Sequence, residues 1–234
     1  VRTALNNAKA KVSKAIEKYK ADTEGDRPTP QFPYPSGPRE YQKLAFENWK
    51  NNKQKGLFAM ATGTGKTRVS ISLVDVLMRN GWVKNVLFLA DRTSLVNQAK
   101  RNFAKLLPNM SVCELSAGGE KDYNARLMFC TYQSMIKYID AEDKRFSTGR
   151  FDLIIIDEAH EGTQTELGGN VVKLLRKSNT KLLALSGTPF NLLSQYDEDH
   201  VYTWDYVMEQ RKKNEWDLVH QGDHNPYAEL PKMH

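Results

Sequence analysis

A glycine-rich segment between two apolar patterns constrains the fold of this chain more than any other feature. It reads Met-Ala-Thr-Gly-Thr-Gly-Lys-Thr over residues 60–67. The run before it, 56–61, has the length and composition of a buried strand, and apolar residues recur at helical spacing over 67–78. The segment therefore predicts a strand, a tight turn and a helix in that order. Glycine adopts positive φ freely, so such a turn can direct its backbone N–H groups at an anion.

The same segment predicts a phosphate-binding site. Lys66 is placed to reach the β- and γ-phosphates of a nucleotide, and Thr67 to ligate Mg²⁺. The full pattern G-x-x-x-x-G-K-[ST] is not met, since Met60 stands where its first glycine belongs. The alternative is a glycine-rich turn with a solvated lysine, but Gly-Lys-Thr between a strand and a helix favours nucleotide binding. The residues expected to bind the nucleotide here are Thr62, Gly63, Thr64, Gly65, Lys66 and Thr67.

An acidic pair follows the most apolar stretch of the chain. Asp157-Glu158-Ala159-His160 comes directly after the run 152–156. Ligands of open parallel sheets bind where the strands end, so this position suits metal and water chemistry. We expect Asp157 to hold Mg²⁺, directly or through water, and Glu158 to orient and deprotonate the water that attacks the γ-phosphate. The structural alternative is two acids that open a turn before a helix.

Apolar runs alternate with helical patterns from residue 38 to residue 190, and together they indicate the fold class. Strands that are apolar throughout are buried on both faces, which indicates a mostly parallel sheet with helices on both sides. The sequence therefore predicts an α/β fold. The expected strands are 56–61, 85–90, 112–115, 127–130, 152–156 and, as the last, 182–185; the expected helices include 38–52, 67–80, 93–107 and 171–176.

The two flanks differ from this central region. Residues 1–20 are basic with apolar positions at helical spacing, which predicts an amphipathic helix, either leaning on a neighbouring domain or touching nucleic-acid backbone. A proline-rich linker follows up to residue 37. Residues 191–234 are expected to form an extension of the central domain that includes a helix. That helix is expected to turn Trp204, Val207 and Met208 inward and to expose Arg211, Lys212 and Lys213.

Composition narrows the class of protein. A net charge of +6 permits a polyanionic partner. The chain lacks an 18-residue apolar run and a signal-peptide pattern, so we expect a soluble cytoplasmic protein with no membrane contact, and its opening on Val1 suggests a piece of a longer one. Cys113 and Cys130 lie in apolar runs, which predicts buried thiols. The five histidines show no metal-ligand spacing.

Two more motifs complete an ordered series. Ser186-Gly187-Thr188-Pro189 follows the run 182–185, and Thr131-Tyr132-Gln133-Ser134 follows 127–130. Along the chain the order is the glycine-rich loop 60–67, then 131–134, then Asp-Glu-Ala-His at 157–160, then 186–189. This ordered series resembles the motifs of the first RecA-like domain of a superfamily 2 helicase or translocase. Within that superfamily, the combination most resembles the motor subunit of type I restriction enzymes and related bacterial helicases.

The resemblance implies roles for further residues. It implies that the nucleotide is ATP, that the fold is a RecA-like P-loop domain, and that hydrolysis needs a second RecA-like domain of the same chain. It implies an adenine contact for Gln42, for which the alternative is an exposed helix residue. Coupling of the nucleotide to DNA and to the second domain is implied for His160, Ser186 and Thr188. Backbone contacts to DNA are implied for Arg92, Thr131 and Gln133.

The same resemblance suggests partner subunits, but it does not decide which of three kinds of nucleic-acid protein this chain belongs to. Type I enzymes would pair this chain with methyltransferase and specificity subunits. Two alternatives share the motifs seen here: an RNA or repair helicase domain, and a nucleotide-gated nucleic-acid clamp that does not translocate. The expected organisation is therefore a basic helix and linker over 1–37, a RecA-like ATP-binding domain over 38–190 and an extension over 191–234 towards a second RecA-like domain.

Overall fold

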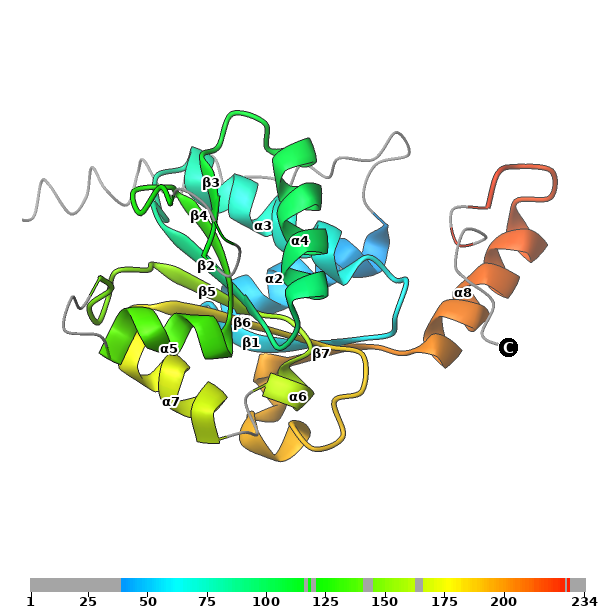
Figure 1. Cartoon of the computed structure of the whole chain (residues 1–234). Helices are drawn as coiled ribbons and strands as arrows, with labels where there is room; N and C mark the ends of the chain where they lie inside the picture. The colour runs from blue at the N-terminus through cyan, green and yellow to red at the C-terminus, as the bar shows by residue number, and fades with distance from the viewer. Residues whose placement is uncertain are drawn as a thin grey trace, which may run out of the picture.

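The computed structural model describes residues 39–115, 118, 121–140, 145–162, 166–225 and 227. The basic helix and linker predicted for 1–37 lie outside this part of the chain. The described residues form a seven-stranded sheet with helices on both faces (Figure 1). The strands are β1 Lys55–Met60, β2 Val86–Ala90, β3 Val112–Glu114, β4 Leu127–Thr131, β5 Leu153–Ile156, β6 Lys181–Ser186 and β7 Val201–Trp204. The helices are α2 Glu40–Asn51, α3 Lys66–Arg79, α4 Thr93–Leu106, α5 Tyr132–Asp140, α6 Ala159–Gly162, α7 Glu166–Leu175 and α8 Tyr206–Val219, with 3₁₀ turns η1 Leu193–Gln195 and η2 Glu198–His200.

The order of the strands brings the predicted motifs to one edge. The sheet runs β3-β4-β2-β5-β6-β1-β7, and each of its strand pairs is parallel. The α/β class with a mostly parallel sheet is thereby confirmed. Because the strands are parallel, their carboxyl ends meet at the same edge. The sequence motifs lie at the ends of β1, β4, β5 and β6, and Arg92 follows β2.

Alternating strand residues supply the two halves of the core. Phe58 and Met60 of β1 belong to the cluster that α2, α3 and α4 cover, whereas Leu57 and Ala59 belong to the cluster under α5 and α7. Figure 1 shows these two groups of helices on opposite faces of the sheet. This alternation is what the uninterrupted apolar runs of the sequence predict. Cys113 and Cys130 are both buried and form no disulfide, as expected.

The region after β6 and the start of α5 depart from the expectations. The prediction that 182–185 is the last strand is wrong, because β7 adds to the sheet beside β1. Trp204 belongs to this strand, not to a helix, and its ring stacks on Tyr41. Val207 and Met208 are not turned inward, since they are 55% and 40% exposed at the start of α8. Helix α5 was not expected, and it begins directly where β4 ends.

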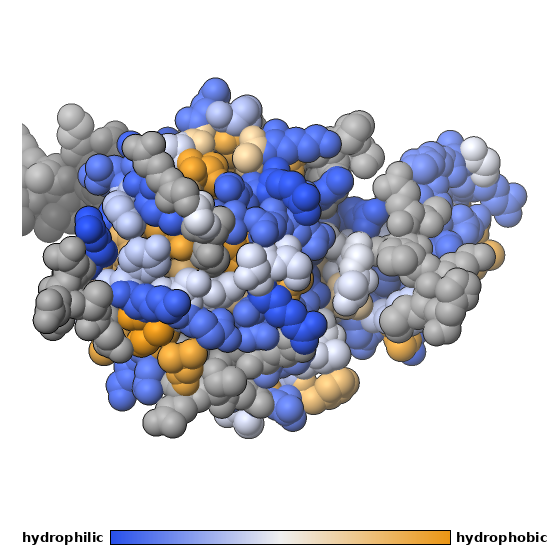
Figure 2. Space-filling view, in the orientation of Figure 1, coloured by the Kyte–Doolittle hydropathy of each residue, from blue (hydrophilic) through white to orange (hydrophobic). Residues whose placement is uncertain are grey.

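The described surface is mainly hydrophilic. Polar residues cover most of the face in Figure 2, and apolar side chains gather in small patches. α8 projects from the side of the sheet (Figure 1). None of the described helices combines the length and the hydropathy that crossing a bilayer requires.

Candidate nucleotide-binding site

The glycine-rich loop joins β1 to α3 and turns at two glycines. Gly63 has a φ of 85° and Gly65 a φ of 89°, the left-handed region that glycine enters without steric cost. Gly65 is also the N-cap of α3. The first N–H groups of α3 lack intrahelical partners and carry partial positive charge, so this end of the helix favours an anion.

A cavity of about 330 Å³ opens at this loop. The loop, α4 and the acidic pair after β5 form its walls, and the size suits part of a small ligand. The lining residues are Thr62, Gly63, Gly65, Lys66, Thr67, Arg68, Leu95, Gln98, Ala99, Asn102, Asp157 and Glu158. Thr64 is the predicted loop residue outside this set, because its side chain is buried and donates to the Ala61 carbonyl at 2.7 Å. Gln98 and Asn102 of α4 were missed, since only the packing of α4 brings them here.

Lys66 lies where β1, the loop and the acids meet. Its Nζ donates to the Met60 carbonyl at 3.0 Å and lies 3.9 Å from Glu158 Oε1. Burial lowers the pKa of this ammonium, and the carboxylates of Glu158 and Asp157 oppose that shift. A Cβ added to Gly187 would lie 3.1 Å from Lys66 Nζ, so the motif after β6 touches the lysine. Gly187 was not among the predicted site residues.

The acidic pair is held in an unusual environment. Burial and the carboxylate of Glu158 raise the pKa of Asp157 to about 6, against the opposing effect of Lys66 and the Glu158 N–H. That N–H donates to Asp157 Oδ1 at 3.2 Å. Glu158 has a φ of 46°, a left-handed conformation that is uncommon outside glycine and occurs at functional sites.

The donor set fits a hard divalent cation. Among the described residues, no group of three or more His, Cys, Asp or Glu side chains is placed to hold a metal. Mg²⁺, however, commonly takes one or two protein oxygens and completes its shell with water and phosphate. The Thr67 hydroxyl and the Asp157 carboxylate line one cavity. A cation there would relieve the cost of a buried carboxylate beside a second one.

The predicted coupling residues lie together. His160 Nδ1 is 2.9 Å from Ser186 Oγ and 3.4 Å from Glu158 Oε2. The Thr188 N–H donates to the same Ser186 hydroxyl at 3.2 Å. The ends of β5 and β6 are thus linked through a buried serine. The coupling role itself stays a prediction.

The predicted nucleic-acid residues follow neighbouring strands β2 and β4. Arg92 is the N-cap of α4, and its side chain is 65% exposed at 3.8 Å from the Asp91 carboxylate. Gln133 is exposed. Thr131 is buried, and its hydroxyl accepts the Ser134 N–H at 3.2 Å. Arg92 and Gln133 are therefore accessible to a ligand, whereas Thr131 supports the start of α5; their contacts with DNA stay predictions.

Helix α2 holds the loop through Tyr41 and Gln42, which are not among the residues that line the cavity. Tyr41 donates its hydroxyl to the Thr64 carbonyl at 2.6 Å, and Gln42 Nε2 donates to the same oxygen at 3.4 Å. Gln42 Oε1 accepts the Arg39 N–H at 3.1 Å. The alternative that Gln42 is an exposed helix residue is wrong, because the residue is fully buried. Its contact with adenine stays a prediction.

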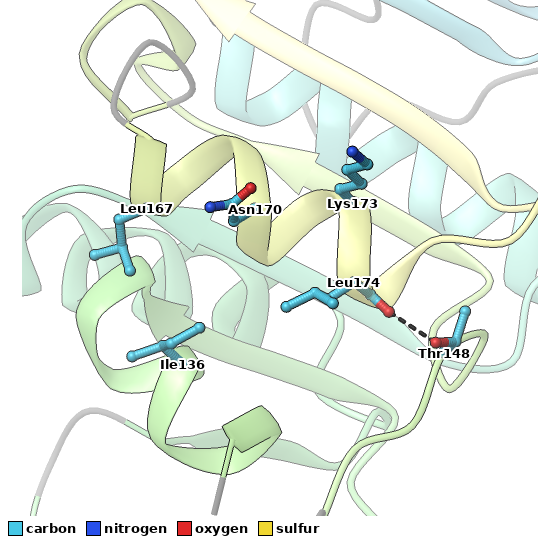
Figure 3. A pocket seen from close by; sticks show the side chains of 6 residues that line it. All are labelled: Ile136, Thr148, Leu167, Asn170, Lys173 and Leu174. Carbon is cyan, nitrogen blue, oxygen red and sulfur yellow. Dashed lines mark hydrogen bonds between the residues drawn. The ribbon is translucent and has the colours of Figure 1, made fainter.

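A larger hollow lies elsewhere and differs in character. It measures about 600 Å³ between α5 and α7, and the Thr148 hydroxyl donates to the Leu174 carbonyl at its rim at 2.9 Å (Figure 3). Its lining residues are Ile136, Thr148, Leu167, Asn170, Lys173 and Leu174. None of them was predicted as a site residue, so the chemistry of the sequence motifs belongs to the smaller cavity.

Comparisons with known proteins identify the family of this chain. The family model described as "Type III restriction enzyme, res subunit" matches residues 36–191. The "Type I restriction enzyme EcoKI endonuclease subunit" of Escherichia coli (strain K12) is 35% identical over 116 residues, which are 47% of this chain and 10% of that protein. The "ATP-dependent DNA helicase fml1" of Schizosaccharomyces pombe is 31% identical over 162 residues, 65% of this chain and 18% of that protein. This chain thus spans less than a fifth of either relative.

Solved structures show the same fold. The Sulfolobus solfataricus SWI2/SNF2 ATPase core in complex with dsDNA superposes with a TM-score of 0.57 at 19% identity, over 74% of this chain and 36% of that one. The Pyrococcus furiosus Hef helicase domain gives a TM-score of 0.58 at 22% identity, over 72% of this chain and 38% of that one. The RecA-like fold implied by the motifs is therefore confirmed.

Proposed function

This chain belongs to the family of the type III restriction enzyme res subunit, and from that membership we propose that it is the ATP- and Mg²⁺-binding motor domain of a DNA helicase or translocase. One observation carries the proposal. Lys66, Asp157 and Glu158, which lie on two segments far apart in sequence, line one cavity beside a glycine-rich loop. Phosphoryl transfer needs such positioned charge more than it needs a reactive side chain.

Within this class, we infer the restriction subunit of a type I restriction-modification enzyme that acts in the cytoplasm. Relatives named as type I endonuclease subunits support this assignment. Methyltransferase and specificity subunits would then be its partners. DNA backbone would run past the ends of β2 and β4, where Arg92, Thr131 and Gln133 lie. A DNA helicase without a restriction role is the second candidate, because relatives named as ATP-dependent DNA helicases match as well.

The residues divide the chemistry among them. The loop amides and Lys66 would bind the phosphates, and Thr67 and Asp157 would hold the metal. When bound, Mg²⁺ supplies charge that neutralises the phosphate oxygens. The Glu158 carboxylate would orient the attacking water and accept its proton. His160 contacts both Glu158 and Ser186, so a movement of Glu158 on nucleotide binding or hydrolysis would be transmitted through it to the end of β6.

Two substitutions separate binding from hydrolysis. Lys66→Ala removes the ammonium group that would bind the phosphates. We expect ATP·Mg²⁺ affinity to fall by roughly ten- to a hundredfold, which corresponds to the loss of hydrogen bonds from a charged group. Glu158→Gln removes the base and keeps the metal ligand, so affinity should stay while hydrolysis is lost. Isothermal titration calorimetry measures the first and phosphate release the second.

Lys43→Ala is the matched control, because Lys43 is an exposed lysine on α2. It should bind ATP like the unmodified chain. Unchanged affinity in Lys66→Ala would refute the nucleotide site. Loss of binding in Glu158→Gln would make that residue a structural support instead of the base.

A further inference from the structure

Behind the phosphate loop, the side chains of Arg39, Tyr41, Trp204 and Glu209 form a connected set, which we term the brace. We infer that the brace positions the loop for nucleotide, so that the segment of β7 and α8 tunes the affinity of the site. This inference rests on the proposed function, since it concerns the same nucleotide. It adds positioning residues that line no part of the cavity.

β7 contacts the loop directly. Trp204 pairs with Met60 in the register of the sheet, and its carbonyl accepts the Ala61 N–H at 3.0 Å. The last residue of β7 is therefore tied to the first residue of the loop. Any displacement of β7 moves the point where the loop leaves the sheet.

Tyr41 extends this contact to the middle of the loop. Its ring stacks on the Trp204 indole with centroids 4.3 Å apart and planes within 9°, and its hydroxyl donates to the Thr64 carbonyl at 2.6 Å. Thr64 stands between Gly63 and Gly65, which restrict the backbone least of all residues. The loop therefore depends on outside contacts for its conformation.

Peptide geometry connects the held carbonyl to the cavity. The Thr64 carbonyl and the Gly65 N–H belong to one planar trans peptide, so they point in opposite directions. Tyr41 holds the carbonyl on the side of α2, whereas Gly65 lines the cavity. Fixing the carbonyl therefore fixes the direction of an N–H group that a phosphate would use.

Glu209 connects α8 to the other residues of the brace. It is fully buried and accepts the Trp204 indole N–H, while Arg39 Nη1 lies 3.7 Å from its Oε1. Arg39 Nη1 also donates to the Tyr41 hydroxyl at 3.1 Å. A buried carboxylate is tolerated only where donors and an opposite charge hold it, so this arrangement ties α8 to α2.

The competing interpretation is that the stacked rings are core packing alone. The two interpretations differ under thermodynamic linkage. If the brace sets the affinity of the loop, nucleotide must in turn stabilise β7 and α8 by the same free energy. Core packing predicts only the general slowing of exchange that ligand binding gives to amides opening by global unfolding, with the same response in Tyr41→Phe at equal occupancy, because β7 and α8 contribute no residue to the cavity lining.

Tyr41→Phe tests the inference, since it keeps the stacked ring and deletes the hydroxyl that holds Thr64. We expect the calorimetric Kd for ATP·Mg²⁺ to rise about three- to tenfold, the loss of one hydrogen bond. In the unmodified chain, ATP·Mg²⁺ should slow amide hydrogen exchange across 201–219, and the effect should shrink in Tyr41→Phe. Tyr202→Phe is the control, because it removes a tyrosine hydroxyl from β7 at a ring that packs edge-on against Phe58 of β1; it should match the unmodified chain.

Two results would overturn the inference while leaving the proposed function in place. One is an unchanged Kd in Tyr41→Phe; the other is exchange over 201–219 that does not respond to nucleotide in the unmodified chain. The second measurement needs no variant, so it holds even if a substitution impairs folding. A chain that binds no nucleotide at all would instead refute the proposed function, and this inference with it.

Discussion

At the scale of single residues, the buried acidic pair lowers the stability of the protein when no nucleotide or metal is bound. Asp157 is buried next to Glu158, and its pKa rises to about 6 from an ordinary value of 3.8. Between those two pH values the native state binds more protons than the unfolded state, so the free energy of unfolding falls as pH rises from about 4 to about 6. Above that range the full cost of the buried charge is present.

Asp157→Asn should therefore stabilise the chain in the absence of nucleotide and metal. At pH 7.5 we expect the free energy of unfolding to rise by on the order of 2–3 kcal/mol, from about 1.4 kcal/mol per unit of pKa. The decline in stability between pH 4 and 6 should flatten as well. Urea denaturation across this pH range measures both effects.

Asp75→Asn is the matched control for that prediction. Asp75 forms an accessible pair with Arg79 at 2.9 Å on α3, and such pairs contribute under about 1 kcal/mol. A loss of stability in Asp157→Asn at pH 7.5 would show that its attraction to Lys66 outweighs its burial.

The sequence predicted those residues whose chemistry is local. Lys66, Asp157 and Glu158 carry their signal in short motifs at strand ends, and the structure brings them together. Gly187 belongs to the predicted motif after β6, but its contact with Lys66 was not predicted, and Tyr41 carries no motif signal. Gly187 reaches Lys66 because β6 lies beside β1, and Tyr41 reaches Thr64 because α2 packs against the loop. Strand order and helix packing decide both contacts, and a single sequence does not display them.

At the scale of elements, the apolar runs were predicted well, the three-residue edge strand β3 among them, whereas β7 and α5 were not expected. β2, β4 and β5 are buried along their whole length, which leaves a clear pattern. β7 has four residues, two of them half-buried and Thr203 exposed, and it stands at the edge of the sheet. Edge strands lack the continuous apolar run of central ones. Its place follows from pairing with β1, which is a tertiary contact.

Gly56→Ala should show how closely β7 and η2 approach β1. A Cβ at residue 56 would lie 2.6 Å from the His200 carbonyl oxygen, a backbone atom that a side-chain rotation cannot move. We expect the free energy of unfolding to fall by about 1–3 kcal/mol, the usual cost of overpacking. Amide exchange over 201–204 should accelerate in parallel.

Gly118→Ala serves as the control, because an added Cβ there meets no atom of the described residues within 4 Å. Its stability should stay within about 0.5 kcal/mol of the unmodified chain, as for surface substitutions in general. Equal stability of the two variants would mean that η2 moves aside without cost.

At the scale of the whole molecule, the described residues form one of the two RecA-like domains that the motifs imply. The described residues after 190 extend the same sheet through β7 and continue into α8. The coupling residues and the predicted DNA contacts all lie at the carboxyl edge of this sheet, with Thr131 and Ser186 as the last residues of β4 and β6. We propose that a second RecA-like domain faces that edge in the longer protein, since this chain spans 10% and 18% of two curated relatives.

This proposal predicts that residues 1–234 bind ATP·Mg²⁺ but hydrolyse it slowly. An arginine supplied to the γ-phosphate from a facing domain contributes on the order of 10³ to 10⁵ in rate. Without it, turnover should stay well below roughly 1 per second, the low end of usual enzymes, with or without DNA. Phosphate release measures the rate, Glu158→Gln sets the background, and a strand-displacement assay should show no unwinding. DNA-stimulated turnover of about 1 per second or faster would instead mean that the chain holds a complete motor, with its own residues serving the γ-phosphate.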